Sequence, residues 1–201
     1  MREQGFFATE DAIQEQATSV LADFYALYEM EQYSIFDDPR DTFFYVQGLI
    51  ADRLERAILT LASLARANDD GGEGFRLHSE KRPEGVGTLI EGETESVLTA
   101  REACNKIIHA KTAKFEFDEE NGHPIYQHLL VRDFGEFDRA FKRPKIHVTG
   151  ERHGGKEWAA IIDVVLWIHA VMHYSTEPPR ILRRLQPLRK WSHEEISEVL
   201  P

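Results

Sequence analysis

The sequence predicts a mostly helical protein, a bundle of four or five helices with a small β-hairpin or three-stranded sheet inserted before the last long helix. Apolar residues recur at three- and four-residue steps along two long segments, and a later segment is apolar nearly all round. Apolar and polar residues alternate at single steps around position 115, which predicts the inserted strands. A chain of 201 residues is long enough for one core and short for two, so we expect a single domain over 1–201.

The first two helices are expected over about 10–32 and 42–67, with Thr9 as the N-cap of the first. An Asp-Asp-Pro turn separates them, which indicates an antiparallel pair. The residues expected to form the two buried stripes are Ile13, Ala17, Val20, Leu21, Phe24, Leu27 and Tyr28 in the first helix, and Phe43, Val46, Ile50, Leu54, Ala57, Ile58, Leu61, Leu64 and Ala65 in the second.

Residues 68–92 are rich in glycine and charge, and they predict a long flexible loop with a short ordered piece at 75–78. A third helix follows over about 95–111, with Thr94 as its cap. Residues 113–160 then form a hairpin-containing insertion with strands near 114–118, 145–149 and 156–160; the stretch 133–143 is either a short helix or an irregular connection.

The fourth long helix is expected over about 160–174, and a Pro-Pro pair stops it. Because it is apolar nearly all round, we expect it to lie at the centre of the fold or in a subunit interface. The segment 180–201 is a tail that is first basic and then acidic.

The formal charge of −11 gives the surface no general attraction for nucleic acid or for an anionic membrane. A single cysteine, Cys104, excludes an intramolecular disulfide and a cysteine-based zinc site. The start of the chain lacks the features of a secretory signal, and the most apolar run is shorter than the ~20 residues of a membrane span. We therefore expect a cytoplasmic protein that does not engage a membrane.

One cluster in the third helix suggests chemistry. Arg101, Asn105 and His109 are spaced four residues apart, so they share one slowly drifting stripe at the edge of the apolar face. Arginine binds phosphate with a planar pair of donors, histidine titrates near neutrality, and asparagine orients a substrate oxygen or the imidazole. The alternative is structural: the stripe pairs with carboxylates and backbone groups where the helix meets the insertion.

The run REACNKIIHA resembles the signature helix of HEPN domains, a family of helical bundles common in bacterial toxin–antitoxin and antiphage systems. The resemblance implies a metal-independent endoribonuclease that works as a homodimer, with a site where two copies of this helix meet. It also implies RNA as substrate and a cognate antitoxin or defence component as partner. In that site His109 would act on the 2′-hydroxyl or the leaving group, and Arg101 would stabilise the charged phosphorane.

The run departs from the family pattern in its spacing. Seven residues separate Arg101 from His109, where the family has four to six, and if Asn105 matches the polar motif residue then Cys104 stands where the motif arginine belongs. Either Arg101 substitutes for that arginine or the chain is an inactive relative. The second hypothesis is therefore a non-catalytic interaction protein of the same architecture, which binds a nucleotide or a protein partner.

The remaining candidates are weaker. His169 and His173 are four apart on the last helix, but two imidazoles do not make a zinc site, and buried polar anchoring is the alternative. Phosphate-binding glycine loops and a GxSxG motif are absent, so no cofactor is predicted, and Cys104 is expected to be a buried small apolar residue. The tail interleaves leucine with basic residues that either contact RNA phosphates or pack against the bundle: Arg180, Arg183, Arg184, Arg189 and Lys190.

Overall fold

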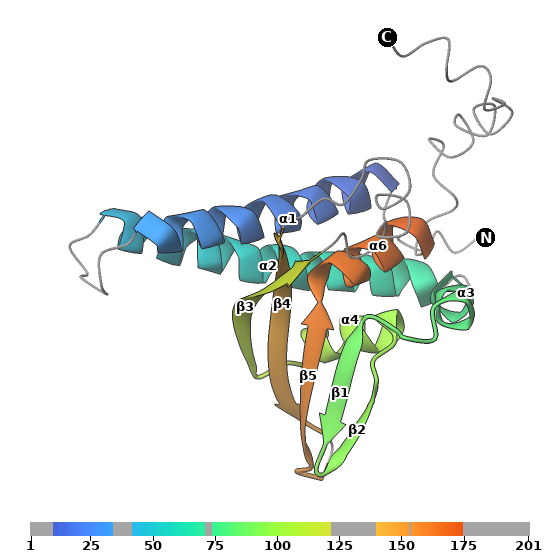
Figure 1. The fold of residues 1–201 in the computed structure, drawn as a ribbon. Coiled ribbons are helices and arrows are strands. Elements are labelled where there is room, and N and C mark those ends of the chain that lie inside the picture. Colours follow the sequence, from blue (N-terminus) through green and yellow to red (C-terminus); the bar gives the residue numbers. More distant parts are fainter. Residues whose placement is uncertain (1–9, 34–41, 71–73, 122–139, 153, 175–201) are drawn as a thin grey trace, which may run out of the picture.

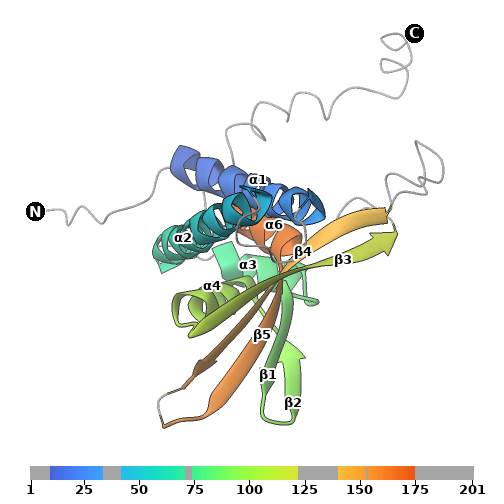
Figure 2. The ribbon, with the colours of Figure 1, turned by 90° about the vertical axis from the view of Figure 1, so that its left-hand side faces the viewer.

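The structure, a computed structural model, describes residues 10–33, 42–70, 74–121, 140–152 and 154–174. Five helices and five strands lie in these ranges. The helices are α1 (Glu10–Tyr33), α2 (Thr42–Asp70), α3 (Gly74–Lys81), α4 (Ala100–Ile108) and α6 (Val164–Tyr174), and the strands are β1 (Gly87–Glu91), β2 (Thr94–Val97), β3 (Thr112–Asn121), β4 (Ala140–Glu151) and β5 (Glu157–Asp163). Figure 1 shows α1 and α2 lying across one end of the sheet, with α4 beside one of its faces; Figure 2 gives the view turned by 90°.

The predicted antiparallel pair of α1 and α2 is confirmed. The Gln16 side-chain amide donates to the carbonyl of Ala57 at 3.1 Å, and Arg53 pairs with Asp23 through an Nε–Oδ2 contact of 2.9 Å. The later residue of α1 contacts the earlier residue of α2, so the two helices run antiparallel. The apolar stripes of both helices meet in the core, where these residues are buried: Ile13, Ala17, Val20, Phe24, Leu27, Leu54, Ala57, Ile58, Leu61 and Ala65.

The expected fold class is wrong, because the sheet is much larger than a hairpin inserted in a bundle. It has five strands in the order β2-β1-β5-β4-β3, and every neighbouring pair is antiparallel. Two of these strands, β1 and β2, were not expected. They are four or five residues long and flank a turn at Gly92, whose φ of 63° is favourable only for a residue without a Cβ.

The segment predicted as a loop over 68–92 holds the end of α2, all of α3 and all of β1. The third helix also begins later than expected, at Ala100, and Thr94 starts β2 instead of capping it. Thr99 is the N-cap: its hydroxyl accepts from the Glu102 amide at 3.2 Å, and the Glu102 carboxylate accepts from the Thr99 amide at 3.4 Å. This reciprocal pair fixes the start of α4.

The last strand and helix are continuous. β5 extends to Asp163, and α6 starts at Val164 where the sequence predicted about 160. Asp163 is buried; it accepts from the Leu166 amide at 2.9 Å and pairs with Arg143 of β4. The buried residues of β5 alternate, as do those of β4, so one sheet face joins the helices in a single core that includes Trp158, Ile162 and Trp167.

Candidate functional site

The stripe predicted on α4 does not gather into one site. Arg101 pairs with two carboxylates at the end of α2: with Asp69 and, through Nη2 at 2.8 Å, with Asp70. Asp69 is buried and also accepts from the backbone amide of Phe75 at 2.9 Å, which anchors the start of α3. Burial and the neighbouring charge of Arg66 lower the pKa of Arg101.

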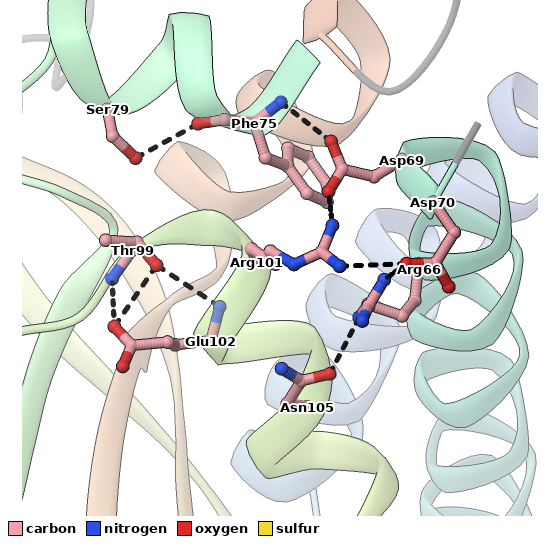
Figure 3. A network of polar contacts seen from close by, with 9 residues as sticks. All are labelled: Arg66, Asp69, Asp70, Phe75, Ser79, Thr99, Arg101, Glu102 and Asn105. Atoms are coloured by element: carbon pink, nitrogen blue, oxygen red, sulfur yellow. Dashed lines mark hydrogen bonds and ion pairs between the residues drawn. The ribbon is translucent and has the colours of Figure 1, made fainter. Parts of the chain in front are cut away.

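Asn105 belongs to the same network. Its side-chain oxygen accepts from Arg66 Nε at 2.9 Å, and Arg66 also pairs with Asp70. Figure 3 shows how these side chains join α2, α3 and α4. We call Arg66, Asp69, Asp70, Arg101 and Asn105 the α2–α4 polar network. Every one of its side chains bonds to another member, which matches the structural interpretation of the stripe.

His109 lies apart from this network. It is the C-cap residue of α4, its backbone amide donates to the carbonyl of Asn105 at 3.1 Å, and its side chain is exposed. It lies eight positions after Arg101, a rise of about 12 Å along the helix axis. Within one copy of the described chain, the Arg101 guanidinium is held by Asp69 and Asp70 near the start of α4, whereas His109 lies at its end.

Cys104 lies between Arg101 and Asn105 and is fully buried, as expected. Trp167 donates its indole N–H to Sγ at 3.4 Å, and burial raises the pKa of the thiol to about 12. The thiolate, which is the nucleophilic form of cysteine, is therefore not populated near neutral pH.

His169 and His173 contact each other on α6, with ring centroids 4.5 Å apart. Burial lowers the pKa of both rings, that of His169 to about 4, with further contributions from His173, Arg82 and His78. In the ranges that the structure describes, no group of three or more histidine, cysteine, aspartate or glutamate residues could hold a metal ion. The basic tail residues Arg180, Arg183, Arg184, Arg189 and Lys190 lie outside the described residues.

Sequence reasoning missed a groove between the helix pair and the sheet. It has a volume of about 820 Å³, and we call it the α2–β3 groove. Its lining comprises Leu27, Tyr28 and Glu31 of α1, Phe44, Gln47, Gly48 and Ala51 of α2, and Lys114, Phe115, Glu116 and Phe117 of β3. Phe117 contacts Tyr28 with ring centroids 4.9 Å apart, and Phe115 meets Phe24 edge to face at 5.3 Å, so aromatic rings form the base of the groove.

Large apolar side chains are exposed beside this groove at the start of α2. The exposed fractions are 42% for Phe43, 37% for Phe44, 65% for Tyr45 and 52% for Leu49. These four residues lie within seven positions on one stretch of one helix, and Phe44 among them lines the groove. Exposed apolar side chains gathered in this way are typical of a surface that binds another molecule. A signal was available in the sequence, because Phe44, Tyr45 and Leu49 lie off the apolar stripe of α2.

A second hollow, of about 1040 Å³, lies at the far tip of the sheet around Gly92, Gly150 and Gly155. Its charged side chains offset one another: Lys111 pairs with Glu151, and Arg152 pairs with Glu91. Such balanced charge gives a phosphate or carboxylate ligand no net attraction. The α2–β3 groove has exposed apolar side chains beside it, which makes it the stronger candidate.

Comparisons of the chain with protein-family models, with curated proteins and with solved structures yield no match. The candidate site is therefore argued from its own geometry. None of the helices in the described ranges is both long enough and apolar enough to cross a membrane.

Proposed function

We propose that this protein is a non-catalytic interaction protein whose binding surface is the α2–β3 groove. The observation that carries the proposal is the cluster of exposed apolar side chains at the start of α2, beside an aromatic-based groove. Exposed aromatic residues next to a concave apolar surface are typical of protein–protein binding sites, where a few of them supply most of the binding energy.

The α2–α4 polar network supports the non-catalytic part of the proposal. Arg101 is engaged by a buried carboxylate and the side-chain oxygen of Asn105 by Arg66, so both side chains already have partners within the fold. Removing Arg101 from Asp69 would leave a buried charge without its partner, which is energetically expensive. These contacts favour a role in fixing the three helices.

A metal-independent endoribonuclease with the HEPN-like motif is the second candidate, and the exposed imidazole of His109 favours it. In that case two copies would form a homodimer that brings each His109 to a phosphodiester. The Arg101 side chain is 40% exposed and would have to leave Asp69 to reach the same phosphate.

A site-specific photo-crosslinker at Tyr45, in the protein expressed in its own host, tests the interaction function. We expect a discrete adduct with a partner that is then identified, purified and shown to bind the full chain. Phe44→Asp should abolish that binding, and Leu59→Asp should preserve it, because Leu59 is an exposed apolar residue of the same helix outside the groove. Equal loss in both variants, or in neither, would overturn the proposal.

RNA cleavage in the presence of EDTA separates the two candidates. The interaction function predicts no cleavage of tRNA, rRNA or mRNA by the wild type. Cleavage that survives EDTA and is lost in His109→Ala would establish the ribonuclease instead.

A further inference from the structure

β3 has one edge that no described strand covers. It is the terminal strand of the order β2-β1-β5-β4-β3, and all ten of its residues pair with β4 on the other side. In an antiparallel strand alternate backbone N–H and C=O groups point to each side, so half of those of β3 point away from β4. A long open edge of this kind is a template for another strand.

The strand with the open edge also lines the α2–β3 groove. Lys114–Phe117, at the middle of this strand, line the α2–β3 groove opposite Phe44, Gly48 and Ala51. A strand laid along this edge would therefore gain both backbone hydrogen bonds and an apolar surface for alternate side chains. This is the combination used where a peptide is recognised by strand addition.

Gly48 leaves room for another chain to approach α2 here. Glycine destabilises a helix interior relative to alanine, yet a Cβ built at Gly48 would meet no atom within 4 Å. No contact within the described chain therefore requires glycine at this position. A second backbone lying close to α2 would require it, and Gly48 lines the groove.

The shape of the molecule limits the occupant. Figure 1 shows the end of α1 and the start of α2 extending beyond β3, so the helix pair overhangs the open edge. A second folded sheet brought edge to edge with β3 would meet these helices. A single extended segment, which is only ~5 Å from its neighbouring strand, fits beneath them.

The charges on the solvent-facing side of β3 indicate which charges a neighbouring strand would carry. Lys114 and Glu116 point to the same face, because they are two residues apart on one strand. Lys114 pairs with Glu116 along the strand, their side chains remain 73% and 35% exposed, and Glu116 also contacts His147 at 3.0 Å. Opposite charges directly across two strands attract and like charges repel, so these two positions select the charges of a neighbouring strand.

We propose that an extended peptide segment of a partner protein adds to β3 as a further strand, with apolar side chains at alternate positions in the α2–β3 groove, an acidic residue opposite Lys114 and a basic residue opposite Glu116. This inference rests on the proposed function and names the form and chemistry of the partner. The partner chain contributes backbone hydrogen bonds to β3 and apolar contacts to Phe44 and Ala51.

The test uses the full chain and a fluorescent peptide of the sequence Lys-Val-Lys-Val-Glu-Val-Thr. In antiparallel pairing its valines face Ala113, Phe115 and Phe117, its glutamate faces Lys114, and its middle lysine faces Glu116. A second peptide, Lys-Val-Glu-Val-Lys-Val-Thr, exchanges only these two charges. We expect fluorescence anisotropy to show binding of the first peptide about tenfold tighter than of the second.

A charge exchange in the protein provides the matched control. In the Lys114→Glu/Glu116→Lys variant the preference between the two peptides should invert, whereas a surface that merely attracts apolar peptides would bind both equally in both proteins. Gly48→Leu should abolish binding of either peptide, since its side chain would enter the groove, and the far-ultraviolet spectrum of each variant should stay that of the wild type. Absence of binding to both peptides, or a preference that does not invert, would overturn strand addition.

The two proposals fail differently. If the partner captured at Tyr45 binds and Phe44→Asp abolishes that binding, but neither peptide binds, then the groove is an interaction surface for a folded or helical partner and strand addition is wrong. If Phe44→Asp has no effect on the partner, the interaction surface itself lies elsewhere.

Discussion

Asp69 shows at the scale of single residues what the Arg101 end of the predicted stripe contacts. Its buried carboxylate receives the Arg101 guanidinium from α4 and the Phe75 amide from α3. One side chain therefore ties together the end of one helix, the start of a second and the first turn of a third. A catalytic arginine, by contrast, needs a phosphate at the position that Asp69 and Asp70 occupy.

Arg101→Ala should destabilise the protein by about 1–3 kcal/mol, because it leaves the buried Asp69 carboxylate without its charged partner. The matched control is Arg76→Ala, which removes an arginine whose ion pair with Glu80 is more than half exposed on both sides. Such surface pairs contribute little, so the control should change stability by less than ~0.5 kcal/mol. Urea unfolding of the three proteins measures the difference, and equal midpoints would contradict a structural role.

Cys104 should resist thiol reagents in the folded protein. Its pKa of about 12 and its complete burial beneath Trp167 leave no reactive thiolate at the surface. Reaction with a chromogenic disulfide should be slow in buffer and fast in denaturant, with one thiol per chain in the denatured state. Fast reaction without denaturant would show that this part of the core opens.

His169 should make the protein less stable in mild acid. Its pKa is about 4 in the fold, below the ordinary value of 6.5, so the unfolded chain takes up a proton more readily. Its contribution to stability is thus fully present above about pH 6.5 and is lost as the pH falls from there towards 4. Because the ring is half-buried, we expect a loss of up to about 1 kcal/mol between pH 7 and 5.5.

Thermal unfolding of the wild type and of His169→Gln, each at both pH values, checks this effect. The melting temperature of the variant should fall less than that of the wild type between pH 7 and 5.5. If the melting temperatures of both proteins fall equally, other groups cause the acid sensitivity. The neighbouring His78 and His173 also have lowered pKa values.

At the scale of elements, α2 combines two halves with different roles. Its second half carries most of its buried residues and packs against α1 and α4, whereas its first half carries the exposed aromatic patch and Gly48. A helix of 29 residues keeps its first half helical through the continuity of its hydrogen bonds. Packing within the described ranges does not require a glycine at position 48, and this residue lines the α2–β3 groove.

Gly48→Ala should stabilise the protein by about 0.5–1 kcal/mol, since the new methyl group meets no atom within 4 Å and the residue is in a helix. Guanidinium unfolding of the two proteins tests this expectation. Gly92→Ala is the control with the opposite expected sign. Its new methyl group would also meet no atom within 4 Å, but the φ of 63° at this position disfavours a residue with a Cβ, so the substitution should destabilise the protein. Destabilisation by Gly48→Ala would mean that the helix cannot accept a Cβ there.

The elements that the sequence predicted well are those whose signal is local. The stripes of α1 and α2 repeat over six or more turns, and the burial of Ile13, Phe24, Leu54 and Leu61 follows from that repeat. β1 and β2 were missed because each is too short for a period to show, and the four residues of β2 are all exposed. Their glycine-rich surroundings are typical of a loop, and only pairing with β5 makes β1 a strand.

At the scale of the whole molecule, the sheet and the groove depend on contacts between residues that are far apart in the sequence. Ile90 of β1 pairs with Ala159 of β5, and the groove is built from α1, α2 and β3. Arg101 and Asn105 of the α4 stripe are partly shielded, as the sequence indicated, whereas His109 is exposed. The partners of Arg101 and Asn105, Asp69 and Arg66, lie more than 30 residues away in the sequence. The sequence therefore could not show whether the stripe binds a substrate or pairs with side chains of the same chain.

The measurement that tests the central claim most directly is hydrogen–deuterium exchange of the full chain with and without the peptide Lys-Val-Lys-Val-Glu-Val-Thr. A strand added to β3 must protect the outward-facing amides of Thr112–Asn121 and slow exchange at the start of α2, with β2 at the opposite edge unchanged. We expect that pattern of protection. Protection centred on α4 and His109, or none at β3, would contradict it.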